Sequence, residues 1–166
     1  MAVVSLDNKR IVITGGARGL GRGFAEAALD SGARIVIADI LEDRGRQTAD
    51  ELSSRGDVSF VLVDLADPAS IEALALSAEQ MLGGVDGLVN CAAIATGIGG
   101  KMADEIDIET WDRVMTVNVR GTWLAVKAFS PALRKAGNGK IVNVASDTAM
   151  WGAPRLLHYV ASKGAV

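Results

Sequence analysis

The sequence has few cysteines and no long apolar or basic stretch, and these shortages exclude several classes of protein. The one cysteine, Cys91, has no partner for an internal disulfide, so we expect a reducing compartment, the cytoplasm. No apolar run approaches the ~20 residues of a membrane helix, and the start, MAVVSLDNKR, lacks the pattern of a signal peptide. The net charge is −3 without a lysine or arginine cluster, which argues against nucleic acid or an anionic membrane as a partner.

Apolar residues and glycine are abundant instead. Apolar residues make up 49% of the chain and charged residues 22%, which is typical of a globular protein. The 19 glycines and three prolines indicate many tight backbone turns and few rigid ones. At 166 residues, the chain is expected to form one domain that covers residues 1–166.

Short apolar runs alternate with helical patterns along the chain. Five β-branched runs predict strands buried on both faces of a sheet, at residues 9–14, 34–38, 58–63, 85–90 and 139–145. The helical patterns include residues 24–29, 42–54, 68–82 and 108–133 and a last helix that carries Tyr159, whereas 93–107 and 148–157 are predicted as loops. Asp67 and Pro68 are expected to start the third of these helices.

This alternation with short connections predicts an α/β fold, a doubly wound parallel sheet of the Rossmann type with right-handed βαβ units. We expect the strand order 3-2-1-4-5. A ligand would then bind above the carboxyl ends of the strands, where strands 1 and 4 diverge.

A glycine-rich turn, TGGARGLG at residues 14–21, joins the first strand to the first helix. Gly15, Gly19 and Gly21 would let backbone N–H groups and the helix N-terminus approach a pyrophosphate. A glycine-rich turn without a ligand is the alternative. The second strand ends at Asp39, where a dinucleotide-binding unit places the carboxylate that binds the ribose hydroxyls of NAD. Arg18 could instead hold the extra phosphate of NADP, but Asp39 would repel that phosphate, so we predict NAD.

Asp39 has an alternative interpretation as the N-cap of the next helix. Other polar or small residues also follow strands: Asp64 with Leu65, then the segment Asn90-Cys91-Ala92-Ala93, then Ser146. All of these positions map to one edge of the predicted sheet. Asn118 lies inside a predicted helix, where asparagine is a mediocre helix former. The alternative for Ala92 is simple packing, and the alternative for Asn118 is an incidental, exposed amide.

Tyr159 and Lys163 are four residues apart and share one face of the last helix. An ammonium about 4 Å from a phenolate, at an effective dielectric near 20, stabilises it by roughly 4 kcal/mol. Such a phenol could donate and accept protons near neutral pH. The alternative is two ordinary residues on a half-exposed helix. His158, the only histidine, would point about 100° round the helix from Tyr159, and we interpret it as incidental.

Together these motifs resemble the short-chain dehydrogenase/reductase family over essentially the whole chain. TGGARGLG matches the cofactor turn of the family, TGxxxGxG, and NCAA at residues 90–93 stands where NNAG is usual. Cys91 and Ala93 depart from that motif, but Asn90 is kept. The catalytic set implied by the resemblance is Asn118, Ser146, Tyr159 and Lys163. The implied cofactor-binding residues are Gly15, Arg18, Gly19, Leu20, Gly21, Asp39, Asp64, Leu65, Asn90, Ala92, Tyr159 and Lys163.

The resemblance implies an oxidoreductase that transfers a hydride between NAD(H) and a secondary alcohol or ketone, without a metal. Tyr159 would exchange a proton with the substrate oxygen, and Lys163 would lower the pKa of Tyr159 and bind the nicotinamide ribose. Ser146 would orient the substrate oxygen. Asn118 would hold a water that connects Lys163 with solvent. The apolar residues Ile94, Ile98, Met150 and Trp151 favour a hydrophobic substrate.

Two alternatives stay open: a 3-oxoacyl-carrier-protein reductase that uses NADPH, and a non-catalytic NAD-binding chain. Members of the family are usually longer, and this sequence ends three residues after Lys163. We therefore expect the two last strands of the family to be missing here and the fifth strand to form an uncovered edge. For the chain alone, weak NAD binding without turnover stays open beside activity. The full-length form would be a homotetramer or homodimer.

Overall fold

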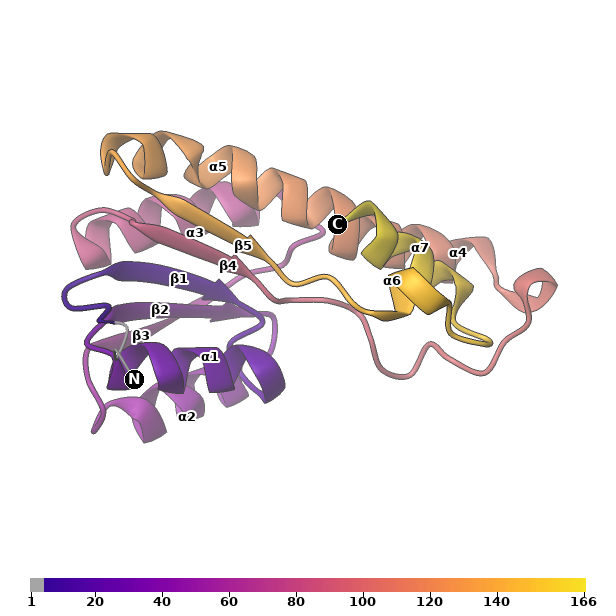
Figure 1. The fold of residues 1–166 in the computed structure, drawn as a ribbon, viewed down its shortest axis with the longest axis horizontal. Helices are drawn as coiled ribbons and strands as arrows, with labels where there is room; N and C mark the ends of the chain where they lie inside the picture. The colour runs from indigo at the N-terminus through magenta and orange to yellow at the C-terminus, as the bar shows by residue number, and fades with distance from the viewer. Residues whose placement is uncertain (1–4) are drawn as a thin grey trace.

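The computed structural model describes residues 5–166 and contains one sheet of five parallel strands (Figure 1). The strands are β1 (Arg10–Thr14), β2 (Arg34–Asp39), β3 (Val58–Leu62), β4 (Gly87–Asn90) and β5 (Lys140–Asn143). Their order in the sheet is β3-β2-β1-β4-β5. The predicted fold class and strand order are therefore confirmed.

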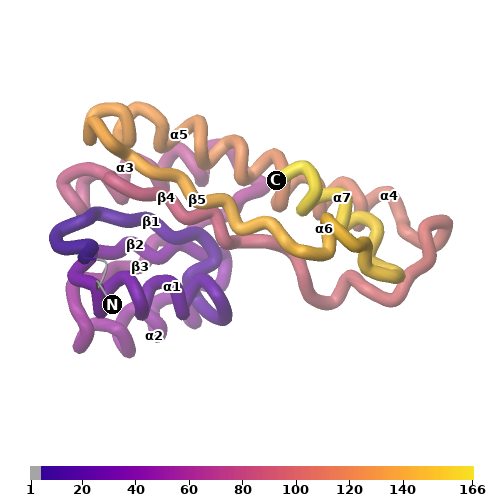
Figure 2. The backbone as a smooth tube through the Cα atoms, viewed as in Figure 1, coloured from indigo at the N-terminus to yellow at the C-terminus, as the bar shows by residue number. Residues whose placement is uncertain are grey.

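Helices cover both faces of this sheet. The helices are α1 (Gly19–Asp30), α2 (Glu42–Leu52), α3 (Pro68–Leu82), α4 (Ile108–Met115), α5 (Thr122–Lys135), α6 (Thr148–Trp151) and α7 (Leu157–Ala165). α1 and α2 lie on one face and α3 and α5 on the other, while α4, α6 and α7 form a lobe beyond the carboxyl ends of the strands (Figures 1 and 2). None of the helices within residues 5–166 is both long and apolar enough to span a bilayer.

Alternate side chains of the central strands supply two separate hydrophobic cores. Val12 and Val36 pack with Phe129 and other residues of α3 and α5. Ile13 and Ile35 face the opposite side and pack with residues of α1 and α2. Successive side chains of a strand point to opposite faces, so β1 and β2 are buried on both faces, as their apolar runs predicted.

The two edge strands correct the prediction of five buried strands. β3 is only half-buried and ends at the exposed Leu62. All four residues of β5 are exposed, and Val142 keeps 53% of its surface accessible. β5 is the last strand of the sheet and pairs only with β4. An apolar run alone cannot distinguish such an edge strand from a central one, because burial depends on what packs against it. The expectation of an uncovered edge is met within residues 5–166.

The helical stretch predicted at residues 108–133 is interrupted. α4 and α5 are separated by a π-helical turn, η2 (Thr116–Gly121), which contains Asn118. Two loops also contain short helices, the 3₁₀ turn η1 (Ala103–Glu105) and α6. The start of α3 is as predicted, because the Asp67 side chain accepts a hydrogen bond from the Ala69 backbone N–H at 2.9 Å.

A clip between Arg10 and Asp86 joins the amino ends of β1 and β4. The Arg10 guanidinium makes two hydrogen bonds to the Asp86 carboxylate, at 2.8 and 2.9 Å, and the Arg10 backbone N–H makes a third at 3.0 Å. The Arg10 guanidinium lowers the pKa of Asp86 from 3.8 to about 2. The folded chain therefore stabilises the ionised form of the Asp86 carboxylate relative to the unfolded chain.

We expect Asp86→Asn to destabilise the protein by roughly 1–2 kcal/mol at neutral pH, allowing for partial exposure of the pair. Because the folded pKa is depressed, this contribution is complete above pH 3.8 and disappears as the pH falls towards 2. Urea unfolding of the variant should therefore show a flatter pH dependence in this range. Asp112→Asn removes an exposed carboxylate from α4 and serves as the control; an equal effect of both substitutions would contradict the role of the clip.

Candidate cofactor and catalytic site

The glycine-rich turn packs so closely that side chains are excluded at three positions, Gly15, Gly16 and Gly21. A Cβ atom on Gly15, whose φ is +72°, would lie 2.7 Å from the backbone N of Ala92. A Cβ atom on Gly21 would lie 2.1 Å from the carbonyl oxygen of Gly15. The turn therefore lies directly on the first turn of α1 and against the segment that follows β4. Arg18, Gly19 and Leu20 are exposed at its surface.

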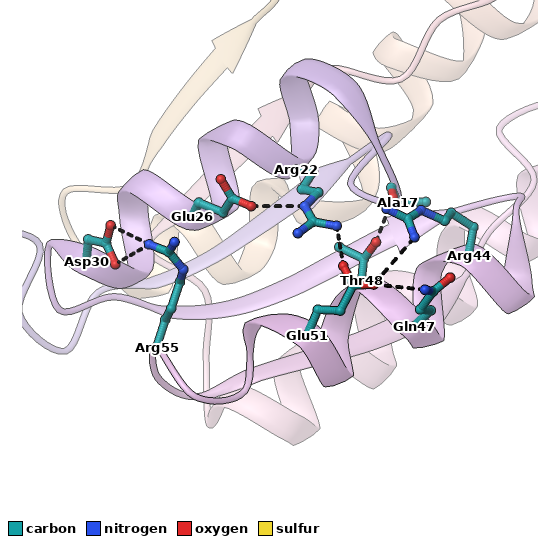
Figure 3. Close-up of polar contacts among 9 residues, drawn as sticks. All are labelled: Ala17, Arg22, Glu26, Asp30, Arg44, Gln47, Thr48, Glu51 and Arg55. Atoms are coloured by element: carbon teal, nitrogen blue, oxygen red, sulfur yellow. Dashed lines mark hydrogen bonds and ion pairs between the residues drawn. The ribbon is translucent and has the colours of Figure 1, made fainter.

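Asp39, at the end of β2, faces this turn. Its carboxylate accepts a hydrogen bond from the Ala17 N–H at 3.1 Å and another from the Leu41 N–H at 3.1 Å. The alternative that Asp39 is a helix N-cap is wrong, because Leu41 occupies the N-cap of α2. The Thr48 hydroxyl of α2 donates to the Ala17 carbonyl at 2.7 Å, as Figure 3 shows. Ala17 is thus held from both sides.

The end of β4 lies beside the turn. The Thr14 hydroxyl accepts hydrogen bonds from the N–H groups of Cys91 at 3.2 Å and Ala92 at 3.3 Å. Asn90 donates to Asn143 of β5 at 2.9 Å, but its own Oδ1 is buried without a hydrogen-bond partner among residues 5–166. Burial of the half-exposed Cys91 thiol raises its pKa.

The residues after β3 divide between surface and core. The Asp64 carboxylate accepts from the Ala66 N–H at 2.8 Å and is half-buried. The side chain of Leu65 is 6% exposed and belongs to the core between the sheet and α3 and α5. Of the two, only Asp64 presents a side chain at the carboxyl edge of the sheet. A contact of Leu65 with a ligand there would involve its backbone.

The residues present fit a dinucleotide. The turn is open at Gly19, where a Cβ atom would meet nothing within 4 Å, so a pyrophosphate can approach its backbone. Asp39 lies at the turn, and the orphaned Asn90 oxygen can accept a hydrogen bond from a ligand. Within residues 5–166, no three histidine, cysteine or carboxylate side chains converge as a metal site.

Lys163 is the most buried charged residue of the lobe. It is 5% exposed, and burial lowers the pKa of its ammonium group. Its Nζ donates to the Val144 carbonyl at 2.6 Å and lies 5.9 Å from the centre of the Tyr159 ring. The two residues therefore share a face of α7, as their spacing predicted. Ser146 lies just beyond β5 and accepts a hydrogen bond from the Thr148 hydroxyl at 2.8 Å.

Asn118 connects three segments of the lobe. Its Oδ1 accepts from the Ile94 N–H at 2.8 Å, and its Nδ2 donates to the Ile94 carbonyl at 3.1 Å and to the Ser162 hydroxyl at 3.0 Å. The Ser162 hydroxyl in turn donates to the Tyr159 carbonyl at 2.7 Å. Asn118 is 1% exposed, so the alternative of an incidental, exposed amide is wrong.

Sequence reasoning missed several residues that support the site. Thr48 and Ser162 are buried hydroxyls whose bonding partners are distant in sequence, so no local motif indicated them. Thr14 opens the glycine-rich turn, but its hydrogen bonds to the segment after β4 were not predicted. His158 is also fully buried, and neither ring nitrogen has a hydrogen-bond partner among residues 5–166. Its interpretation as incidental gave no sign of this burial, which results from the packing of α7 against its neighbours.

A cavity of about 260 Å³ lies between the loop after β4 and α4. Ile94 and Ile98 line one side of it, and Thr110, Arg113 and Val114 of α4 line the other. Ile94 is the residue that Asn118 holds, so this cavity adjoins the lobe that carries Tyr159. Its lining is mixed, with polar and charged groups beside Ile94 and Ile98. Met150 and Trp151, the other two apolar residues predicted to favour a hydrophobic substrate, are exposed and do not line it.

Comparison with known proteins assigns the chain to a family. The family model described as short chain dehydrogenase matches residues 9–166. The chain belongs to this family, the short-chain dehydrogenases/reductases, which confirms the resemblance found in the sequence.

Similar proteins include two dehydrogenases and one solved structure. The chain is 40% identical over 162 residues to 2-(S)-hydroxypropyl-CoM dehydrogenase 3 of Xanthobacter autotrophicus, covering 97% of the chain and 62% of that protein. It is 38% identical over 164 residues to galactitol 2-dehydrogenase of Agrobacterium fabrum, covering 97% and 61%. The crystal structure of a short-chain dehydrogenase/reductase from Burkholderia phymatum in complex with NAD superposes with a TM-score of 0.91 at 34% identity, covering 98% and 58%. The chain thus spans between 58% and 62% of the length of these relatives.

Proposed function

We propose that this chain carries the cofactor site and the proton-transfer residues of an oxidoreductase that interconverts a secondary alcohol and a ketone with NAD. One observation carries the proposal: Tyr159 and Lys163 share a face of α7, and the Lys163 Nζ binds the Val144 carbonyl at the end of β5. Tyr159 therefore lies at the end of the sheet that also carries the glycine-rich turn and Asp39. The names of two similar proteins, 2-(S)-hydroxypropyl-CoM dehydrogenase and galactitol 2-dehydrogenase, specify hydroxylated substrates and support an alcohol.

The nicotinamide ring of NAD, when bound, supplies the hydride acceptor or donor. Tyr159 takes the proton of the alcohol O–H as the C–H bond breaks, and returns it to the carbonyl oxygen in the reverse direction. The Lys163 ammonium stabilises the resulting phenolate. One of its three N–H donors is used by Val144, so two remain for a ribose hydroxyl and water.

Ser146 donates a hydrogen bond to the substrate oxygen and orients it. The Asn118 side chain already makes three hydrogen bonds to protein groups. Both N–H donors of this amide are used, so Asn118 would support a water chain towards Lys163 by shaping the site and not by donating to a water. Asn118 also fixes the loop at Ile94, next to the cavity.

Gly15, Gly19 and Gly21, with the exposed backbone at Arg18 and Leu20, bind the pyrophosphate. Asp39 binds the adenosine ribose, while Asp64 and the backbone of Leu65 contact the adenine. Asn90 and Ala92 lie along the nicotinamide half. We further propose that the active form is a homodimer or homotetramer.

A second candidate function is binding of NAD without turnover. The exposed β5 edge, next to the segment that carries Ser146, favours it for residues 5–166 alone. Absorbance at 340 nm with NAD and a panel of secondary alcohols separates the two. NADH formation supports the dehydrogenase, whereas calorimetric NAD binding without NADH formation supports the second function. A preference for NADPH would favour the 3-oxoacyl-carrier-protein reductase.

Asp39→Ala is expected to raise the ratio of NADPH to NADH affinity by about tenfold or more, because the carboxylate repels a 2′-phosphate and binds the ribose hydroxyls. Fluorescence titration with both dinucleotides measures the ratio. Asp39→Asn keeps hydrogen-bonding capacity near Ala17 and should shift the ratio in the same direction. Asp43→Ala removes an exposed acid from the first turn of α2 and is the control. An unchanged ratio in both Asp39 variants would show that the carboxylate is not at the ribose.

A further inference from the structure

A network of charged side chains joins α1 and α2 beside the glycine-rich turn (Figure 3). Glu51 lies at its centre. One carboxylate oxygen pairs with the Arg22 guanidinium, and the other pairs with Arg44 at 3.6 Å and accepts a hydrogen bond from Gln47 at 2.8 Å. Arg22 has a second carboxylate partner, Glu26, at 2.9 Å. The Arg22 guanidinium lowers the pKa of Glu51, so its carboxylate is ionised at neutral pH.

Arg44 lies close to the segment that Asp39 contacts. It precedes Thr48 by four residues on α2, so the two side chains share a face of the helix. The Thr48 hydroxyl binds the Ala17 carbonyl, and the Ala17 N–H binds Asp39. Figure 3 shows the Arg44 side chain on this face of α2, with its guanidinium paired to Glu51. Arg44 is therefore one helical turn from the residue that binds Ala17, and Ala17 in turn binds Asp39.

A guanidinium at this place has chemical consequences for the choice of cofactor. Arginine binds phosphate strongly because its planar fork matches the phosphate oxygens and its charge is permanent. An unpaired arginine near the ribose would therefore favour NADP. Glu51 is the one carboxylate that pairs with Arg44 among residues 5–166, whereas Arg22 would remain paired with Glu26 if Glu51 were removed.

We propose that Glu51 is a specificity-determining residue: it holds Arg44 away from the adenosine ribose and so strengthens the preference for NAD that Asp39 establishes. This inference rests on the proposed function, because it requires the turn to bind a dinucleotide. It assigns a role to a residue on α2 that lies outside the glycine-rich turn and outside the sheet edge. Glu51 acts through Arg44 and does not itself contact the cofactor.

Calorimetric titration of NADH and NADPH into the wild-type chain and Glu51→Gln tests the inference without a need for turnover. We expect the NADPH affinity of the variant to rise about threefold to fivefold, since one guanidinium becomes available to the 2′-phosphate, while NADH affinity stays within about 1.5-fold. In the double variant Glu51→Gln with Arg44→Gln, NADPH affinity should return to the wild-type value, because the gain is assigned to Arg44.

Asp30→Asn is the matched control. Asp30 also pairs with an arginine, Arg55 at 2.8 Å, but it lies at the far end of α1 from the turn. Its removal should leave both affinities unchanged. The inference is overturned if Glu51→Gln has no effect, if Asp30→Asn has the same effect, or if the gain persists without Arg44. A wild-type chain that binds neither dinucleotide would overturn both the proposed function and this inference. A wild-type chain that binds NADH, with an NADPH affinity that Glu51→Gln leaves unchanged, would overturn this inference alone.

Discussion

Tyr159→Phe is expected to lower turnover by about a thousandfold or more while leaving NADH binding nearly unchanged. The substitution removes one oxygen atom, which is the proposed proton acceptor, and general acid–base catalysis typically contributes factors of about 10²–10⁴. The ring and its position over Lys163, 5.9 Å from the Nζ, remain. The assay follows NADH at 340 nm with a secondary alcohol, using the form of the protein that shows dehydrogenase activity.

Dissociation constants for NADH, measured on wild type and variant, control for loss of the cofactor site. A variant that binds NADH normally and has lost turnover supports the proton-transfer role of Tyr159. Turnover within a few-fold of wild type would eliminate that role. A parallel loss of binding and turnover would instead assign the half-buried Tyr159 side chain to cofactor binding.

The sheet and the positions at its edge were predictable because they depend on local patterns. Alternation of apolar runs with helical periodicity defined the strand order, and the glycines at 15 and 21 indicated a close turn that the structure contains. Asp39 was placed correctly at a strand end next to that turn, since its position follows from the length of β2.

The features that were missed depend on contacts between distant segments. The π-helical turn at Asn118 coincides with two such contacts, the Asn118 amide on Ile94 and the close approach of Gly121 to the Leu65 carbonyl, where a Cβ atom would lie at 2.8 Å. Neither contact has a signature within the sequence TVNVRG. The burial on both faces that the apolar run of β5 predicted was wrong for a related reason, because such a run resembles that of a central strand; only the resemblance to the family indicated an uncovered edge there.

Asn118→Ala is expected to destabilise the lobe by roughly 3–4 kcal/mol. The substitution removes three hydrogen bonds, one of them to the buried Ser162 hydroxyl, and leaves the N–H and carbonyl of the half-buried Ile94 without protein partners, at the lower end of about 1–3 kcal/mol for each unsatisfied group. Because Asn118 joins the loop after β4 to α7 through Ser162, the effect should be concentrated there. Thermal unfolding measures the total loss, and Asn138→Ala, at an exposed turn, is the control.

Hydrogen exchange separates a local effect from a global one. The Ile94 amide donates to Asn118 and should exchange more than about a hundredfold faster in the variant, if the lost interactions act mainly on local opening. The amide of Val12, in the central strand, should accelerate much less. Equal acceleration at both sites would mean that Asn118 supports the whole fold, and unchanged exchange at Ile94 would contradict the role of Asn118 in holding the loop after β4. Acceleration confined to Ile94 would show that the lobe is ordered around one buried amide, because its hydrogen bonds link the segments next to the cavity and Tyr159.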